Sequence, residues 1–402
     1  MTVNQISDQR INALSNITKY YVAHILSGAS FIVPITILYY LSFGLSYFQI
    51  ATLESVFLLS AFIFEIPTGA LADTFGRKYI VALGVLFVAF STILIGIGGS
   101  LFIFLIAQVL FGIGAALRSG ADTSLMYDSM DAANLSKDYT KVEGTSFALF
   151  SLFGAIAAPL GAYIFVLNRR LPFFIDGIML LFAAYAYFLM KESKKKLAND
   201  IPKKSYRSIL ATGVREAIQN PIIRWYILFT VLLSTTIGFF ASVLSQPVLL
   251  SKGISVSAVG YAFSGVLLIQ MLGSLYAHKI EKLFKEKISL LLVFIIPGLS
   301  LLLMQVHTIA LFFFFFACYY LSKGFQYPLL KKYIQTHIPP TTRATILSSQ
   351  NFFDSLVGIL LLPILGFIID QTSVINGVKL LGIFILVLGF LLFAFRPKHK
   401  FN

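Results

Sequence analysis

Long apolar stretches alternate with short polar connections along almost the whole chain. Most of these stretches come close to the roughly 20 residues that a helix needs to cross a bilayer. The strands of a membrane barrel would instead read as short segments of alternating polarity. The pattern therefore predicts twelve membrane-spanning helices, over 20–41, 50–72, 79–98, 101–128, 141–167, 171–190, 224–250, 256–279, 288–306, 309–332, 344–369 and 374–395.

Composition agrees with a polytopic membrane protein and excludes other classes. Of 402 residues, 58% are hydrophobic and only 12% are charged, whereas soluble domains carry about 25% charged residues. The single Cys318 cannot build a disulfide framework, and the five His residues are scattered, so we expect no metal site. No phosphate-binding loop of the form G-x-x-x-x-G-K-S/T occurs. We therefore expect no enzyme, no cofactor and no ATP-driven transport.

Basic residues are distributed unevenly between the two sides of the predicted helices. Of the 31 Lys and Arg residues, the loops on one side hold only Arg169, Arg170, Lys252 and Lys379. By the positive-inside rule, both termini and the more basic loops face the cytoplasm. The net charge of +14 is thus mainly an orientation signal, and we expect no nucleic-acid partner. The run KESKKK at 191–196 could also touch anionic lipid head groups.

A polar stretch over 191–221 divides the chain into two bundles of six predicted helices, 1–190 and 222–402. It carries many of the basic residues and two prolines. We expect it to be a cytoplasmic linker between two domains.

The two bundles share an internal register. A shift of 204 residues places Gly154 on Gly358 and Pro159 on Pro363. Parallel repeats about an axis along the membrane normal build transporters with a substrate site near the midplane. The predicted fold is therefore an all-α integral membrane protein, with twelve transmembrane helices in two halves related by pseudo-twofold symmetry.

The connection between the second and third predicted helices carries a dense motif, GALADTFGRK at 69–78. It resembles the signature loop of the major facilitator superfamily, G-x-L-A-D-x-x-G-R-K, at every key position. The resemblance implies a secondary transporter that works by alternating access. It also implies that a charged network at this loop latches the cytoplasmic gate. The matching positions are Gly69, Asp73, Gly76, Arg77 and Lys78.

Asp128, at the cytoplasmic end of the fourth predicted helix, is the partner that we expect for Arg77. Glycines permit close helix approach and tight turns, and an acid at a helix C-terminus needs a cation from elsewhere. The alternative is that Arg77 and Lys78 only obey the positive-inside rule.

Ionisable residues inside predicted spans are costly and therefore candidates for function. Arg118 and Asp122 lie four apart in 101–128, so we expect them to share a helix face and to pair. They belong either to the proton or substrate path or to a structural ion pair near the inner gate. The superfamily's span-four Arg position is Gln108 here, so that coupling residue cannot be carried over.

Glu65 is the first candidate for a proton carrier, because a carboxyl at its depth must be neutral, paired or hydrated. A purely structural role is the alternative. Asp354 and Lys323 are its counterparts in the second half, where they could meet across a cavity. Asp176 lies near the outer end of its span, where we expect water to reach it.

The fifth predicted helix contains SLFGAIAAPLGAYI, which partly resembles the G-x-x-x-G-P-x-x-G-G motif of drug–proton antiporters. Ala158 replaces the Gly before Pro159, and Gly161 comes one residue early. Small residues at a helix interface explain the pattern as well.

These observations favour a proton-coupled exporter of small amphipathic or drug-like compounds. An uptake carrier for a sugar or small metabolite, or a lipid-handling or sensor protein, remains the alternative. The resemblance implies a monomer in the bacterial inner membrane, with protons, membrane lipids and a small-molecule substrate as partners.

Overall fold

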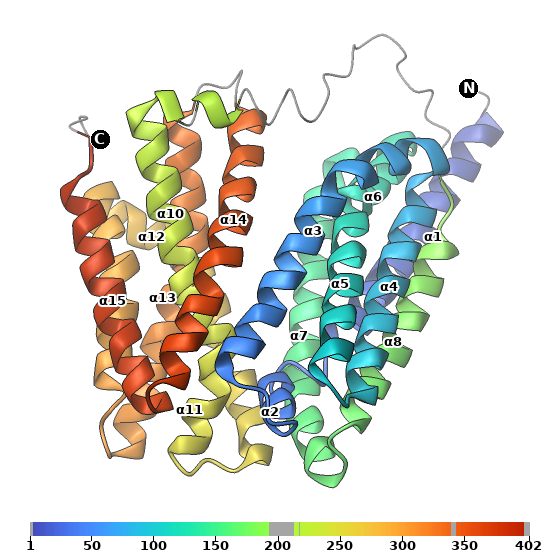
Figure 1. Ribbon diagram of the computed structural model, residues 1–402. Helices are drawn as coiled ribbons and strands as arrows, with labels where there is room; N and C mark the ends of the chain where they lie inside the picture. Colours follow the sequence, from blue (N-terminus) through green and yellow to red (C-terminus); the bar gives the residue numbers. More distant parts are fainter. Residues whose placement is uncertain (1–2, 193–212, 217, 339–342, 398–402) are drawn as a thin grey trace. The chain divides into compact units, whose positions relative to one another are not determined.

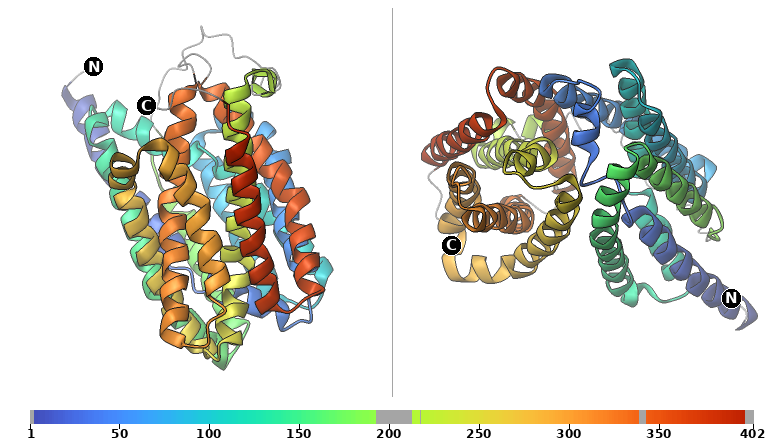
Figure 2. Two further views of the ribbon diagram at one scale, coloured as in Figure 1. Left: turned by 90° about the vertical axis from the view of Figure 1, so that its left-hand side faces the viewer. Right: turned by 90° about the horizontal axis from the view of Figure 1, so that it is seen from below.

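The computed structural model describes residues 3–192, 213–216, 218–338 and 343–397 (Figure 1). The described residues form helices and no strand. Within each half of the chain the helices run side by side along their length (Figure 2). Their bounds are α1 Val3–Gly28, α2 Thr36–Leu41, α3 Tyr47–Phe75, α4 Arg77–Ile97, α5 Leu101–Arg118, α6 Ala121–Ala132, η1 Ser136–Asp138, α7 Tyr139–Leu167, α8 Leu171–Phe188, α10 Pro221–Phe239, the π-helix η2 Phe240–Leu244, α11 Ser245–Ser251, α12 Val256–Leu303, α13 Ile309–His337, α14 Arg343–Asp370 and α15 Val374–Ala394.

Ten helical segments of the described chain are long and apolar enough to cross a membrane. One of them, α12, has 48 residues and would measure about 72 Å as a straight helix, more than twice the roughly 30 Å of a hydrocarbon core. Lys285 breaks it with non-helical angles, φ 52° and ψ 178°. This segment therefore holds the two spans predicted over 256–279 and 288–306.

The remaining predicted span, 20–41, is not one continuous helix, so that prediction was wrong. Helix α1 ends at Gly28 and the chain is helical again only at Thr36. Pro34 has no N–H to donate. A Cβ on Gly28 would lie 2.5 Å from the carbonyl oxygen of Phe150, so α7 passes this point at backbone contact.

Asp176 of α8 satisfies the backbone at this break. Its carboxylate accepts hydrogen bonds from Ser30 Oγ and from the Phe31 N–H, both at 2.7 Å. Only 4% of Asp176 is exposed. The expectation that water reaches this side chain at a helix end was therefore wrong. Irregular backbone at membrane depth needs such protein partners, because lipid offers none.

The fourth predicted span is also interrupted. Helix α5 ends at Arg118 and α6 begins at Ala121, with Gly120 between them at φ 70°. Glycine adopts this left-handed conformation without a Cβ penalty. The prediction of one helix over 101–128 missed this break.

Two compact units divide the chain. The first comprises Met1–Phe43, Val56–Pro202 and Val256–Ser264, and the second comprises Gly44–Ser55, Lys203–Ser255 and Gly265–Asn402. Each unit thus combines most of one sequence half with a short segment of the other half.

Small residues set the helix packing in the first unit. A Cβ on Gly161 of α7 would lie 1.9 Å from the Phe31 carbonyl oxygen, and one on Gly154 would lie 3.0 Å from that of Gly28. A Cβ on Gly260 would similarly lie 2.6 Å from the Cα of Pro159. The antiporter-like residues of the fifth span therefore serve close packing against the broken first span and the start of α12.

In the second unit, α14 carries Gly358 and Pro363 and packs against the beginning of α3. A Cβ on Gly366 would lie 2.4 Å from the Tyr47 carbonyl oxygen. Asp370 accepts hydrogen bonds from the N–H groups of Tyr47 and Phe48, both at 2.8 Å. A carboxylate at free helix N–H groups also meets the positive end of the helix dipole.

Candidate functional site

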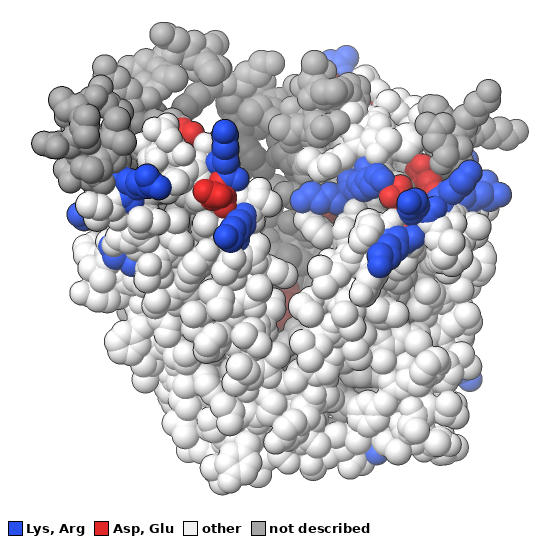
Figure 3. Space-filling model, turned by 180° about the vertical axis from the view of Figure 1, so that it is seen from behind, with Lys and Arg blue, Asp and Glu red and all other residues white. Residues whose placement is uncertain are grey.

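Charged side chains gather toward one end of the helices on the face shown in Figure 3, and most of the remaining surface there carries no charge. A surface of this kind is expected where apolar helices meet lipid.

The turn between α3 and α4 lies at this charged end. Gly76 adopts φ 94°, so the tight turn needs glycine. The Arg77 guanidinium forms an ion pair with Asp128 of α6. The two side chains are 32% and 26% exposed. The structure thus brings together the two residues that the sequence predicted as partners.

Glu192 is a further member of this turn, and sequence reasoning missed it. Its Oε1 accepts the Arg77 N–H at 2.5 Å, where the first turn of α4 leaves backbone donors free. A Cβ on Gly76 would lie 2.5 Å from Glu192 Oε2. Glu192 follows the end of α8 in a basic stretch, so its sequence position resembled a solvated loop.

The structure gives fewer contacts for the other residues of the motif. Lys78 Nζ lies 4.7 Å from the ring centroid of Tyr79 and 5.5 Å from that of Phe188, a cation–π arrangement. Gly69 and Asp73 belong to α3, but the side chains of residues 66–74 lie outside the described part of the structure.

Arg118 and Asp122 face each other across the break between α5 and α6. Their nearest N–O distance is 4.0 Å, which is a loose ion pair. The Arg118 Nε is buried and makes no hydrogen bond to a described group. Tyr187 of α8 is 1% exposed, and its ring centroid lies 6.3 Å from that of Tyr20.

A polar cluster continues from this pair into α1 and α7. The Tyr20 hydroxyl donates to Glu143 Oε2 at 3.0 Å, and Tyr20 is fully buried. His24 Nδ1 lies 2.9 Å from the Tyr20 carbonyl oxygen. Sequence reasoning missed Glu143, because it stands one turn into α7 beside a basic loop and reads as a surface acid.

Glu65 is half-buried in α3, within the first unit. A second acid of the same helix, Glu54, belongs to the second unit and was not singled out from the sequence.

Asp354 of α14 lines a cavity of about 320 Å³ in the second unit, together with Lys331 of α13. Lys323 does not line it, and in the described part of the chain Lys323 and Asp354 form no ion pair. The expected meeting of these two residues was therefore wrong. Lys323 stands eight positions before Lys331, about 12 Å along the helix, with its ammonium 6.0 Å from the Tyr320 ring centroid.

The cavity is lined mostly by polar side chains from three helices. They are Thr230 and Ser234 of α10, Tyr327 and Lys331 of α13, and Gln350, Asn351 and Asp354 of α14. Gln326 Nε2 donates to Ser234 Oγ at 3.3 Å.

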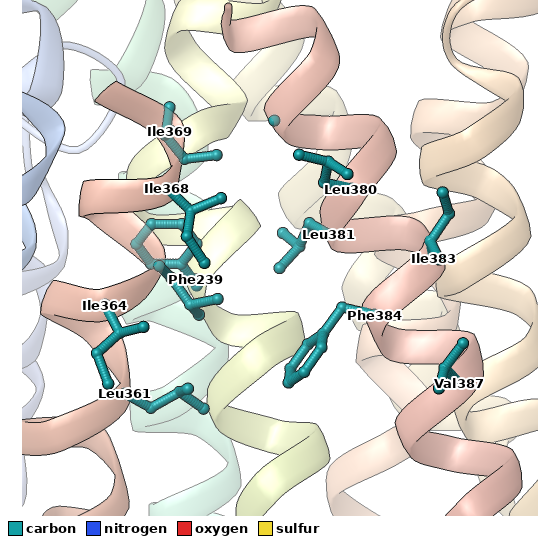
Figure 4. Close-up of a pocket in the computed structure, with 12 residues that line it drawn as sticks. Phe239, Leu361, Ile364, Ile368, Ile369, Leu380, Leu381, Ile383, Phe384 and Val387 are labelled. Atoms are coloured by element: carbon teal, nitrogen blue, oxygen red, sulfur yellow. The ribbon is translucent and has the colours of Figure 1, made fainter. Parts of the chain in front are cut away.

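A second cavity of about 410 Å³ in the same unit has an apolar lining (Figure 4). Phe239 forms one wall, and apolar side chains of α14 and α15 form the others, among them Ile368 and Phe384. Such a groove suits alkyl chains, but it offers no group that could carry a proton or bind a charge.

A helical membrane bundle with this charged turn between α3 and α4, and with ionisable groups within its spans, is typical of a polytopic membrane transporter. The family model of the Major Facilitator Superfamily matches residues 20–360, with a further match over 237–401. The chain belongs to this superfamily.

Two curated relatives give the chain a more specific context. Multidrug resistance protein 2 of Bacillus subtilis (strain 168) is 28% identical over 189 residues, which is 47% of this chain and 46% of the relative. Quinolone resistance protein NorA of Staphylococcus aureus is 22% identical over 172 residues, 43% of each. The matches thus span less than half the length of these relatives.

Solved structures share the fold over nearly the whole chain. The nucleoside transporter NupG has a TM-score of 0.78 at 13% identity and covers 97% of this chain and 100% of its own. A bacterial homolog to the human lysosomal transporter Spinster has a TM-score of 0.70 at 16% identity, with 96% of each chain covered. At such identities the likeness shows the fold alone.

Proposed function

We propose that this chain is a proton-coupled secondary transporter of the bacterial inner membrane that exports small amphipathic or drug-like compounds by alternating access. Superfamily membership supports transport. The relatives named for multidrug and quinolone resistance support export. The uneven distribution of Lys and Arg supports cytoplasmic termini.

Asp354 is the observation that carries the proposed coupling. It places a carboxylate in a polar cavity inside a membrane-spanning helix, where a charge is costly unless it serves a path for ions or substrate. Proton binding would neutralise this carboxylate, and release would restore its charge. Glu65 and Asp122 are the further candidates for the same role.

The Arg77–Asp128 ion pair is the proposed latch of the cytoplasmic gate. It joins the start of α4 to α6, and Glu192 holds the backbone of the same turn. Exposed ion pairs contribute only about 0–1 kcal/mol to stability. Such a contact can therefore open and close in each transport cycle at small cost.

A second candidate function is uptake of a small polar metabolite. The polar lining of the Asp354 cavity favours it, because a purely apolar drug would leave the carboxamides and hydroxyls there without partners.

Everted membrane vesicles test the proposal. A respiratory substrate acidifies the vesicle interior, and a pH-sensitive dye reports the gradient while compounds from a panel are added. Proton-coupled export predicts that substrates dissipate the gradient in wild-type vesicles but not with Asp354→Asn. The exposed Asp138 in η1 supplies the matched control, Asp138→Asn, which should behave like wild type. Accumulation of a polar metabolite by intact cells, with no response in everted vesicles, would favour uptake instead.

A further inference from the structure

We propose that the cavity lined by Thr230, Lys331 and Asp354 binds a zwitterionic head group, with an ammonium group at Asp354 and a carboxylate group at Lys331. This inference rests on the proposed transport function and adds the chemical class of the substrate. The site lies entirely within the second unit.

One buried hydroxyl in the cavity wall has no hydrogen-bond partner among the described residues. Thr230 is 6% exposed and lines the cavity, yet its Oγ1 is buried and makes no hydrogen bond to a described group. A buried polar group left unpaired costs about 1–3 kcal/mol. A polar ligand in the cavity would supply the missing partner.

The two charges of the cavity come from different helices. Asp354 stands on α14 and Lys331 on α13, and neither forms an ion pair within the described residues. Lys331 Nζ donates to the Tyr327 hydroxyl at 3.2 Å. The neutral Gln350 lines the cavity together with Asp354. Neither charge is neutralised by an ion pair with a described residue, so both are available to a ligand.

The neighbouring lysine shows the contrast. Lys332 Nζ pairs with Glu281 of α12 at 2.6 Å, and Lys332 does not line the cavity. Two successive lysines on one helix therefore have different electrostatic partners. Among the described residues Lys331 has no carboxylate partner, so its charge can pair with a ligand carboxylate.

The cavity volume limits the size of the head group. About 320 Å³ lies at the small end of the roughly 300–1,000 Å³ range of small-molecule sites. Leu330 and Leu347 also line it and can contact a short apolar spacer. An ω-amino acid, with an amine and a carboxylate separated by a few methylene groups, matches this arrangement.

The chain contains a single tryptophan, Trp225, which provides a binding signal close to the site. It lies on α10, five residues before Thr230, and its ring stacks on Phe229 with centroids 4.9 Å apart. The full chain, purified in detergent, is titrated with ω-amino acids of graded length while Trp225 fluorescence is recorded. Isothermal calorimetry provides a second readout that needs no fluorescence change.

The analogue comparison tests the zwitterion assignment. For the best-binding ω-amino acid, its methyl ester and its N-acetyl derivative should each bind at least about tenfold more weakly, because each loses one charged hydrogen bond. Lys331→Gln should abolish the preference for the free acid over the ester. Asp354→Asn should abolish the preference for the free amine over the amide. Lys332→Gln is the matched control and should preserve both preferences.

Several results would overturn this inference. They are equal affinity for the three analogues, equal behaviour of Lys331→Gln and Lys332→Gln, or no binding of any ω-amino acid in either readout. Thermal unfolding of each variant shows that it is folded. The binding assay requires neither a proton gradient nor transport. Zwitterion binding without proton exchange would therefore refute the proposed coupling alone, and proton exchange without zwitterion binding would refute only this site.

Discussion

The carboxylate of Asp176 accepts the backbone N–H of Phe31 at 2.7 Å, across 145 positions of sequence. Helix α8 thereby supplies an acceptor at the point where the first span loses its helical hydrogen bonds. The buried acid explains how an irregular segment persists among apolar helices.

Replacing Asp176 by Ala should destabilise the folded protein. The Phe31 N–H and the Ser30 hydroxyl would both lose their acceptor, at about 1–3 kcal/mol for each buried group left unpaired. Asp176→Asn keeps one carbonyl acceptor and should cost less. Thermal unfolding in detergent measures the order, and Asp138→Ala, at an exposed position, serves as control. An unchanged unfolding temperature for Asp176→Ala would show that the hydrogen bonds of Asp176 to Ser30 and Phe31 do not stabilise the fold.

Two glycines of α7 should respond to the same substitution with opposite signs. A Cβ on Gly161 would lie 1.9 Å from the Phe31 carbonyl oxygen, whereas one on Gly144 would meet nothing within 4 Å. Gly161→Ala should therefore lose about 1–3 kcal/mol through overpacking. Gly144→Ala should gain up to about 1 kcal/mol from helix propensity. Unfolding temperatures of the two variants check this, and equal effects would argue against close packing at Gly161.

Breaking the Arg77–Asp128 pair should impair transport more than folding. Arg77→Ala and Asp128→Ala each remove one partner of a partly exposed ion pair, which stabilises a fold by only about 0–1 kcal/mol. We expect most turnover to be lost with little change in unfolding temperature. The exchange of both charges, Arg77→Asp with Asp128→Arg, should restore part of the activity. Wild-type turnover in either single variant would refute the latch.

Glu65→Gln separates a proton carrier from a structural acid. If Glu65 carries the proton, the variant should lose gradient-driven transport but keep substrate binding and energy-independent exchange. If its role is structural, expression or thermal stability should fall instead. Glu54→Gln, in the same helix, is the matched comparison. Normal uphill transport by Glu65→Gln would move the proton role to Asp122 or Asp354.

Topology is tested by cysteine labelling from outside the cell. The single Cys318 is first replaced by Ser, which gives a background without thiols. A membrane-impermeant reagent should then label Gly99→Cys and Ser373→Cys but not Asp200→Cys, because the basic loops are expected inside. Labelling of Asp200→Cys in intact cells would reverse the proposed orientation.

Sequence predicted the helical membrane fold well, because apolar runs of spanning length leave few alternatives. It did not predict the interruptions at 29–35 and 119–120. A break inside an apolar run is stabilised by distant partners, such as Asp176, or depends on the conformation of one residue, such as Gly120.

The candidate site residues also differ in how far the sequence could predict them. Arg77 and Asp128 could be paired from the sequence because the superfamily motif fixes one partner and helix direction indicates the other. Lys323 was singled out because it lies inside a predicted span, whereas Lys331 stands at the basic cytoplasmic end of the same span. Which lysine of α13 lines the same cavity as Asp354 depends on how three helices pack, and no local sequence pattern predicts that packing.

Glu192 joins the turn between α3 and α4 to the end of α8. The Arg77–Asp128 ion pair and the Glu192 hydrogen bond to Arg77 both lie before residue 193, within the first sequence half. A protein supplied as two polypeptides, divided after residue 200, would therefore retain the carboxylate that caps α4. A division placed just before Glu192 would remove that cap, although it would leave every span predicted before 191 intact.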